Sequence, residues 1–172
     1  MIAATMMLAS LLTLAGEPAE PHATIEKAHV FLFASVDCPI SNRYAPEVIR
    51  LHERFAERGV RFSLVYADPS QNAAMIKTHL QEYGYPLSAF RDPQQRFAQK
   101  VGARVTPEAV VFDDERRLVY RGRIDDRYVD FGQRRREPTQ RDLNDLLERL
   151  VADERLTLTE TRAVGCYLPP ID

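Results

Sequence analysis

The chain has 172 residues, of which 45% are hydrophobic and 28% are charged, and this balance is typical of a single globular domain. Its formal net charge of −2 excludes a general nucleic-acid-binding protein, so we expect no nucleic acid among its partners. The low counts of cysteine (2) and glycine (7) exclude a disulfide-stapled scaffold, a cysteine-only zinc site and a glycine-rich phosphate loop, and we expect no cofactor and no metal.

The chain begins with an apolar segment. Residues 1–15 are almost all apolar; the run is shorter than the roughly 20 residues that cross a bilayer, and it is typical of the apolar region of a signal peptide. We therefore interpret residues 1–23 as a signal peptide or an N-terminal tail and residues 24–172 as the folded domain. This predicts an exported protein, periplasmic or peripherally associated with a membrane. No Lys or Arg precedes Lys27, and a buried N-terminal helix is the alternative.

Short apolar runs alternate with segments of helical spacing over the rest of the chain. Strands separated by helices, followed by a hairpin, predict an α/β sandwich in which helices cover both faces of a mixed central sheet. We expect strands at residues 29–35, 60–67, 87–91, 109–112 and 118–123, helices at residues 43–58, 70–83, 93–101 and 139–151, and a polar loop at residues 125–138.

Several of these boundaries depend on single residues. Gly59 ends the first helix, and Pro46 kinks it because proline removes a backbone donor. Ser70 is the candidate N-cap of the second helix, and Pro93 fits the first turn of the third. Residues 139–142 (TQRD) resemble a capping box that opens the last helix.

Cys38 lies between the first predicted strand and the first predicted helix, just before the helix begins. Backbone N–H groups at a helix start favour the thiolate and lower the pKa of such a thiol. A buried and unreactive thiol is the alternative, because free cysteines also serve as core residues. Thr106 and Pro107 precede the predicted hairpin strand, and proline belongs at the entrance of a strand. We expect a cis peptide bond there, with an ordinary trans turn as the alternative.

These features together resemble the thioredoxin fold: a buried strand, a cysteine at a helix start, Pro46 eight residues later and a Thr-Pro pair before a hairpin. From about Val30 to Cys166, the chain is similar to the redoxin/AhpC-TSA (peroxiredoxin-like) branch of that fold. The resemblance implies a thioredoxin-like three-layer sandwich. It also implies that Cys38 is the nucleophilic thiol and that Pro107 is the cis-proline beside it, which positions extended substrate backbone.

The second cysteine is interpreted through the same resemblance. Thioredoxins carry C-x-x-C, whereas residues 38–41 read C-x-x-S, so no resolving thiol lies on the same helix turn; the Ser41 hydroxyl could donate a hydrogen bond to the thiolate. Cys166 follows the last helix, as the resolving cysteine of two-cysteine peroxiredoxins does. It would condense with a sulfenate on Cys38 to a disulfide, within one chain or across a homodimer. A structural disulfide and an unpaired thiol are the alternatives.

Further binding residues follow from the peroxiredoxin pattern. Peroxiredoxins carry P-x-x-x-[ST]-x-x-C, in which Ser35 fills the serine position while Phe31 replaces the proline. They also place an arginine against the thiolate and the peroxide oxygens, and Arg121 or Arg123 would fill that role. Thr106, beside the expected cis-proline, completes the predicted substrate-binding set.

The sequence therefore predicts a thiol-dependent oxidoreductase of the redoxin type, in which the Cys38 thiolate attacks a peroxide or the disulfide of a partner protein. An external thiol reductant, such as a thioredoxin-like protein, would complete turnover. The alternative from another class is a non-catalytic thioredoxin-fold module that docks on a membrane or periplasmic redox complex. In that module, a Cys38–Cys166 disulfide would be structural.

Overall fold

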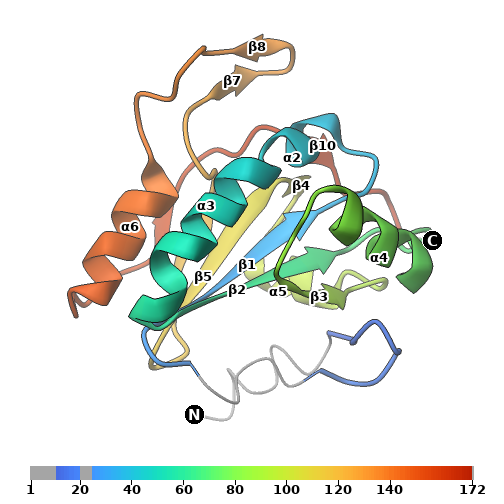
Figure 1. Ribbon diagram of the computed structural model, residues 1–172, viewed down its shortest axis with the longest axis horizontal. Coiled ribbons are helices and arrows are strands. Elements are labelled where there is room, and N and C mark those ends of the chain that lie inside the picture. Colours follow the sequence, from blue (N-terminus) through green and yellow to red (C-terminus); the bar gives the residue numbers. More distant parts are fainter. Residues whose placement is uncertain (1–10, 20–24, 172) are drawn as a thin grey trace.

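A computed structural model describes residues 11–19 and 25–171 (Figure 1). Its strands are β1 (Ala28–Ala34), β2 (Val60–Tyr66), β3 (Ser88–Arg91), β4 (Val105–Thr106), β5 (Glu108–Asp113), β6 (Leu118–Gly122), β7 (Tyr128–Asp130), β8 (Gln133–Arg134), β9 (Thr159–Glu160) and β10 (Cys166–Tyr167). Its helices are α2 (Pro39–Arg43), α3 (Ala45–Phe55), a 3-10 turn (Ala56–Arg58), α4 (Ala73–Glu82), α5 (Arg96–Val101) and α6 (Asp142–Val151).

The main sheet has the strand order β3-β2-β1-β5-β6-β9. Strands β1, β2 and β3 are parallel to one another, as helical crossovers require, whereas β5 pairs antiparallel with both β1 and β6. The predicted mixed sheet and the predicted hairpin are therefore confirmed. Two short pairs, β4 with β10 and β7 with β8, lie outside the main sheet.

The sheet is buried on both faces because β1 alternates between two apolar clusters. Val30 and Leu32 belong to the cluster that contains residues of α3, α4 and α6, whereas Phe31 and Phe33 pack with residues of α5. Burial of each such side chain stabilises the fold by about 1.5–3 kcal/mol. Helices on both faces of the sheet make the three-layer, thioredoxin-like sandwich that the sequence predicts (Figure 1).

The described part of the N-terminal segment contacts the folded domain. Leu12 exchanges two backbone hydrogen bonds with Arg91 of β3, at 2.9 and 2.8 Å, and Leu11 and Ala19 are buried in the cluster on the α5 face. Most of the predicted apolar leader lies outside the described residues, and its removal from the mature protein stays a prediction. Among the residues that the structure describes, no helix has the length and apolar character to span a bilayer.

The first predicted helix is wrong in one respect, because it is two helices that meet at Tyr44. Pro46 lies in the first turn of α3, where its missing N–H has no helical acceptor to lose, so it opens a helix instead of kinking one. Gly59 ends the 3-10 turn with a φ of +83°, as expected of a C-terminal glycine.

The predicted starts of the other helices are also corrected. Asn72, and not Ser70, caps α4, because its side-chain oxygen accepts hydrogen bonds from the amides of Ala74 and Met75, both at 3.0 Å. The Ser70 hydroxyl instead donates to Asp68 at 2.6 Å. Helix α5 begins three residues after Pro93, at Arg96, so Pro93 is not in its first turn.

The segment before the last helix differs most from the prediction. Helix α6 begins at Asp142, and the hydroxyl of Thr139 donates to Asp126, so no capping box forms. The predicted polar loop contains the β7–β8 hairpin, which projects from the sandwich (Figure 1). Strands of two or three residues carry no detectable periodicity, which is why β4 and β7 to β10 are absent from the prediction.

Candidate active site

Cys38 is the N-cap residue of α2, at the carboxyl end of the central strand. Its sulfur accepts a hydrogen bond from the Ser41 amide at 3.4 Å, and the protonated thiol donates to the Thr106 carbonyl oxygen at 3.0 Å. The peptide bond between Thr106 and Pro107 is cis, which confirms the prediction from the sequence. The Cys38 side chain is almost fully covered, with 1% of the residue exposed.

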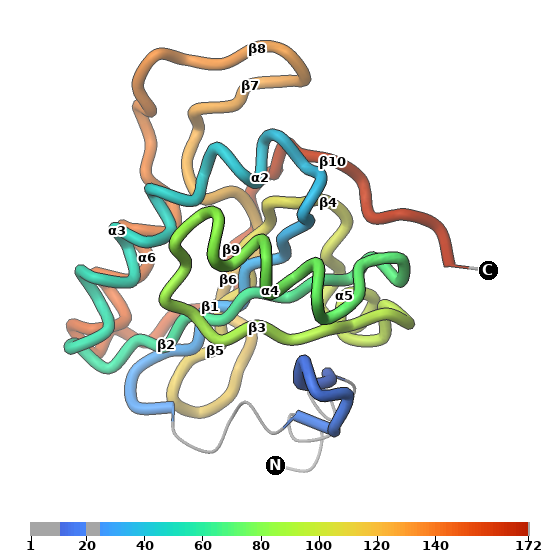
Figure 2. The backbone as a smooth tube through the Cα atoms, turned by 45° about the vertical axis from the view of Figure 1, so that its right-hand side comes forward, coloured from blue at the N-terminus to red at the C-terminus, as the bar shows by residue number. Residues whose placement is uncertain are grey.

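Cys166 lies beside Cys38 because β10 pairs with β4. The antiparallel register places Cys166 opposite Thr106, the residue before the cis-proline. Gly165 makes this approach possible, since a Cβ atom at that position would lie 2.1 Å from the Thr106 carbonyl oxygen. Cys166 packs against the apolar cluster that contains Cys38, and both thiols are free. Figures 1 and 2 both show β10 running past β4 and α2 at this end of the sheet.

The two thiols are driven toward opposite protonation states. Burial opposes ionisation of Cys38, but hydrogen bonds from the side chains of Cys166 and Thr106 and from the amides of Ser41 and Cys166 outweigh it and lower the pKa of Cys38. Burial, the hydrogen bond to Cys38 and the negative charge of Cys38 raise the pKa of Cys166 to about 12. The arrangement therefore favours ionisation of Cys38 over ionisation of Cys166.

The amide side chains of Gln71 and Asn42 fix the loop that precedes Cys38. Gln71 is 1% exposed; its amide nitrogen donates to the Ser35 hydroxyl at 2.8 Å, and its oxygen accepts from the Val36 amide at 3.3 Å. Asn42 donates to the Val36 carbonyl at 2.9 Å and makes a 2.8 Å hydrogen bond to His79. Sequence reasoning missed Gln71. The available signal was its position in the turn after β2, beside the strand that ends at the site.

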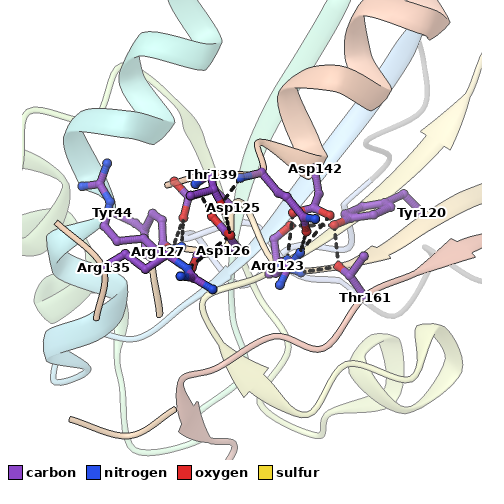
Figure 3. Close-up of polar contacts among 11 residues, drawn as sticks. Tyr44, Tyr120, Arg123, Asp125, Asp126, Arg127, Arg135, Thr139, Asp142 and Thr161 are labelled. Atoms are coloured by element: carbon purple, nitrogen blue, oxygen red, sulfur yellow. Dashed lines mark hydrogen bonds and ion pairs between the residues drawn. The ribbon is translucent and has the colours of Figure 1, made fainter. Parts of the chain in front are cut away.

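Three predicted site residues make contacts other than the expected ones. Ser41 is buried, and its amide, not its hydroxyl, reaches the Cys38 sulfur. Arg121 forms an ion pair with Glu160 at 2.5 Å and lies over Gly102, and Arg123 forms an ion pair with Asp142 at 2.8 Å (Figure 3). Among the described residues, the hydrogen-bond partners of Cys38 include neither arginine.

Two buried carboxylates support the segment beneath the β7–β8 hairpin. The Tyr44 hydroxyl, between α2 and α3, donates to Asp125 at 2.5 Å (Figure 3). Burial alone would raise the pKa of Asp126, but hydrogen bonds from Thr139 and Gln140 outweigh it and lower that pKa to about 2. These carboxylates therefore anchor the hairpin to the sandwich. Within residues 11–19 and 25–171, no three His, Cys, Asp or Glu side chains gather as a metal site requires.

A cysteine at the start of a helix, facing a cis-proline at the carboxyl end of a central parallel strand, defines the chain as a thioredoxin-like protein with a thiol site. The Redoxin family profile matches residues 10–131, more than half of the chain. The chain therefore belongs to the redoxin family, and its activity is of the thiol oxidoreductase type. Cys166 lies beyond the matched residues.

Comparisons with solved structures agree on the fold. An uncharacterized conserved protein from Geobacillus kaustophilus is 23% identical, with 94% of this chain and 87% of that chain covered and a TM-score of 0.79. A hypothetical protein from Sinorhizobium meliloti is 22% identical, with 92% and 88% covered and a TM-score of 0.74. A secreted Mycobacterium tuberculosis disulfide oxidoreductase is 17% identical, with 86% and 98% covered and a TM-score of 0.57. No curated protein matches the chain.

Proposed function

We propose that the protein is a two-cysteine thiol oxidoreductase that cycles between the Cys38–Cys166 dithiol and an intramolecular disulfide. The observation that carries this proposal is the placement of Cys166 beside Cys38: Cys166 lies opposite Thr106, whose carbonyl accepts a hydrogen bond from Cys38, and each thiol shifts the pKa of the other. The pKa of Cys38 is lowered and that of Cys166 is raised, which supports Cys38 as the attacking thiolate and Cys166 as the resolving thiol.

The oxidative half of the cycle is a two-electron oxidation of the cysteine pair. With a hydroperoxide, the Cys38 thiolate attacks the terminal oxygen; an S–O bond forms, the O–O bond breaks, and the departing alkoxide or hydroxide takes a proton. The Cys166 sulfur then attacks the sulfenic acid on Cys38. The S–S bond forms, and the hydroxyl leaves as water with the proton that Cys166 gives up.

The same pair serves a disulfide substrate. The Cys38 thiolate attacks one substrate sulfur and expels the other as a thiolate, and Cys166 then displaces the substrate from the mixed disulfide. In both cases an external dithiol, such as a thioredoxin-like protein, supplies two electrons and leaves as a disulfide. A docking module with a structural bridge is the competing function, and the lowered pKa of Cys38 beside Pro107 favours the reactive pair.

Stoichiometric oxidation of the reduced protein tests the proposal. One equivalent of hydrogen peroxide is expected to produce a Cys38–Cys166 disulfide in peptide mass spectrometry. Cys166→Ser should retain the sulfenic acid on Cys38, trapped by dimedone, and Cys38→Ser should lose the rapid reaction. Oxidation that yields no bond between these two cysteines, with peroxide or with a disulfide reagent, would overturn the proposal.

A further inference from the structure

The backbone edge beside Cys38 is occupied by the chain's own C-terminal segment. Strand β10 pairs antiparallel with β4, with Cys166 opposite Thr106 and Tyr167 opposite Val105. The Leu168 amide continues the ladder by donating to the Arg104 carbonyl at 2.9 Å. Residues 165–169, which we call the resident strand, thus fill the edge of β4 that borders the thiol.

The resident strand is held at its far end and at the segment that leads into it. Downstream, the side-chain amide of Gln95, itself mostly buried, donates to the Pro169 carbonyl at 2.7 Å. Upstream, the Thr161 amide donates to the Arg121 carbonyl at 3.1 Å, and the Thr161 hydroxyl makes a 2.7 Å hydrogen bond to the Tyr120 hydroxyl (Figure 3). Hydrogen bonds at both ends therefore fix the resident strand in place in the reduced protein.

An edge strand beside a reactive thiol is the place where an extended peptide would add, because its unpaired N–H and C=O groups accept another strand. Here the resident strand already uses those groups of β4, and Cys38 beneath it is 1% exposed. A small molecule needs only a local opening of side chains to reach the sulfur. A protein chain would have to replace the resident strand along its whole length.

We propose that the resident strand closes Cys38 of the reduced protein to polypeptide chains, so that its oxidant is a small molecule and not the disulfide of a protein. This inference rests on the proposed function and adds the substrate class to it. Protein partners would meet the pair at Cys166, which is partly exposed and precedes Tyr167, a side chain in open solvent with 78% exposure.

The reductive half of the cycle fits this arrangement. A dithiol reductant attacks the Cys166 sulfur of the disulfide, the S–S bond breaks, and Cys38 departs with the electron pair. The second thiol of the reductant then releases Cys166 and forms the reductant's own disulfide. A thiol of lowered pKa leaves faster, and the hydrogen bonds to Cys38 provide this property.

Two probes with the same leaving group test the size limit. A small cysteine derivative and an extended peptide each carry a thionitrobenzoate mixed disulfide, and both are applied to Cys166→Ser, in which Cys38 is the only thiol. We expect the small probe to react at least about tenfold faster, because strand replacement breaks two or more backbone hydrogen bonds. Equal rates would overturn the proposal.

A variant that displaces the resident strand provides a second test of the proposal. Gly165→Ala, combined with Cys166→Ser, puts a methyl group against the Thr106 carbonyl and should raise the peptide rate about tenfold while changing the small-probe rate much less. Cys166→Ser alone is the matched reference, because the two proteins then differ only in the methyl group at residue 165. A peptide rate that Gly165→Ala leaves unchanged, despite faster hydrogen exchange at the Leu168 amide, would refute the closing role.

These outcomes are separate from those that test the proposed function. If no oxidant joins Cys38 to Cys166 in the wild-type protein, the two-cysteine cycle is wrong. If the disulfide forms readily but peptide and small probes react equally with Cys38, the cycle stands and only the closing role of the resident strand is wrong.

Discussion

Removing the thiol group of Cys166 should raise the pKa of Cys38 and so destabilise its thiolate form. The Cys166 side chain is one of four donor groups that favour the ionised sulfur, together with the Thr106 side chain and two backbone amides. Cys166→Ala deletes this donor and leaves the amide of residue 166 in place, whereas Cys166→Ser keeps a hydroxyl donor. A hydrogen bond to a charged group contributes about 1.5–3 kcal/mol. At pH values below the pKa of Cys38, losing this bond should therefore reduce the fraction of Cys38 in the thiolate form by about 10- to 100-fold.

The rate of iodoacetamide alkylation measures this fraction directly, because the thiolate is the reacting species and Cys38 is the only thiol in both variants. The alkylation profile of Cys166→Ala should lie at higher pH than that of Cys166→Ser. Circular dichroism of both variants provides the control that the fold is retained. Superimposable profiles would refute the argument that the second thiol, across the β4–β10 pair, sets the protonation of the first.

Three stability predictions follow from particular contacts. The fold lowers the pKa of Cys38, so the free energy of unfolding of the reduced protein, relative to Cys38→Ser, should rise as pH increases from the pKa of Cys38 in the folded protein to that of an ordinary thiol. The same difference should fall as pH decreases through this range. Urea unfolding midpoints of both proteins across the range test the direction of the change. Asn72→Ala should cost about 1 kcal/mol in urea unfolding through the lost cap of α4, and Ser70→Ala clearly less, so equal effects would contradict the assignment of the cap. Tyr44→Phe should cost about 1–3 kcal/mol because it removes a donor from the buried carboxylate of Asp125, and an unchanged thermal midpoint would show that the carboxylate is otherwise satisfied.

The sequence predicts the parts of the fold that depend on local pattern. The apolar run of β1 and the alternation in the hairpin β5–β6 identify strands, since buried strands need continuous or alternating apolar side chains. Cys38 at a helix start and Pro107 at the start of a strand can both be recognised from the sequence, because each lies beside the boundary of a predicted element. Together with the resemblance to the thioredoxin fold, these two positions predicted a thiol site next to a cis-proline.

Sequence reasoning fails where a residue's partner is far away in the chain. Arg121 was predicted near the thiolate, yet its register in β6 aligns it with Glu160 of β9 and turns its guanidinium toward Gly102. Charge and chain position alone do not specify which face of a sheet an arginine occupies.

The sequence by itself determined an α/β sandwich and one candidate nucleophile, because strand patterns and helix starts depend on neighbouring residues, and its resemblance to a known family implied the thioredoxin-like form of that sandwich. Only the tertiary structure decided that Cys166 contacts Cys38, since this requires pairing of β10 with β4 some sixty residues earlier and a glycine that fits against the Thr106 carbonyl. Such a contact depends on main-chain hydrogen bonds and steric fit between distant segments. Neither leaves a periodic signal in the sequence.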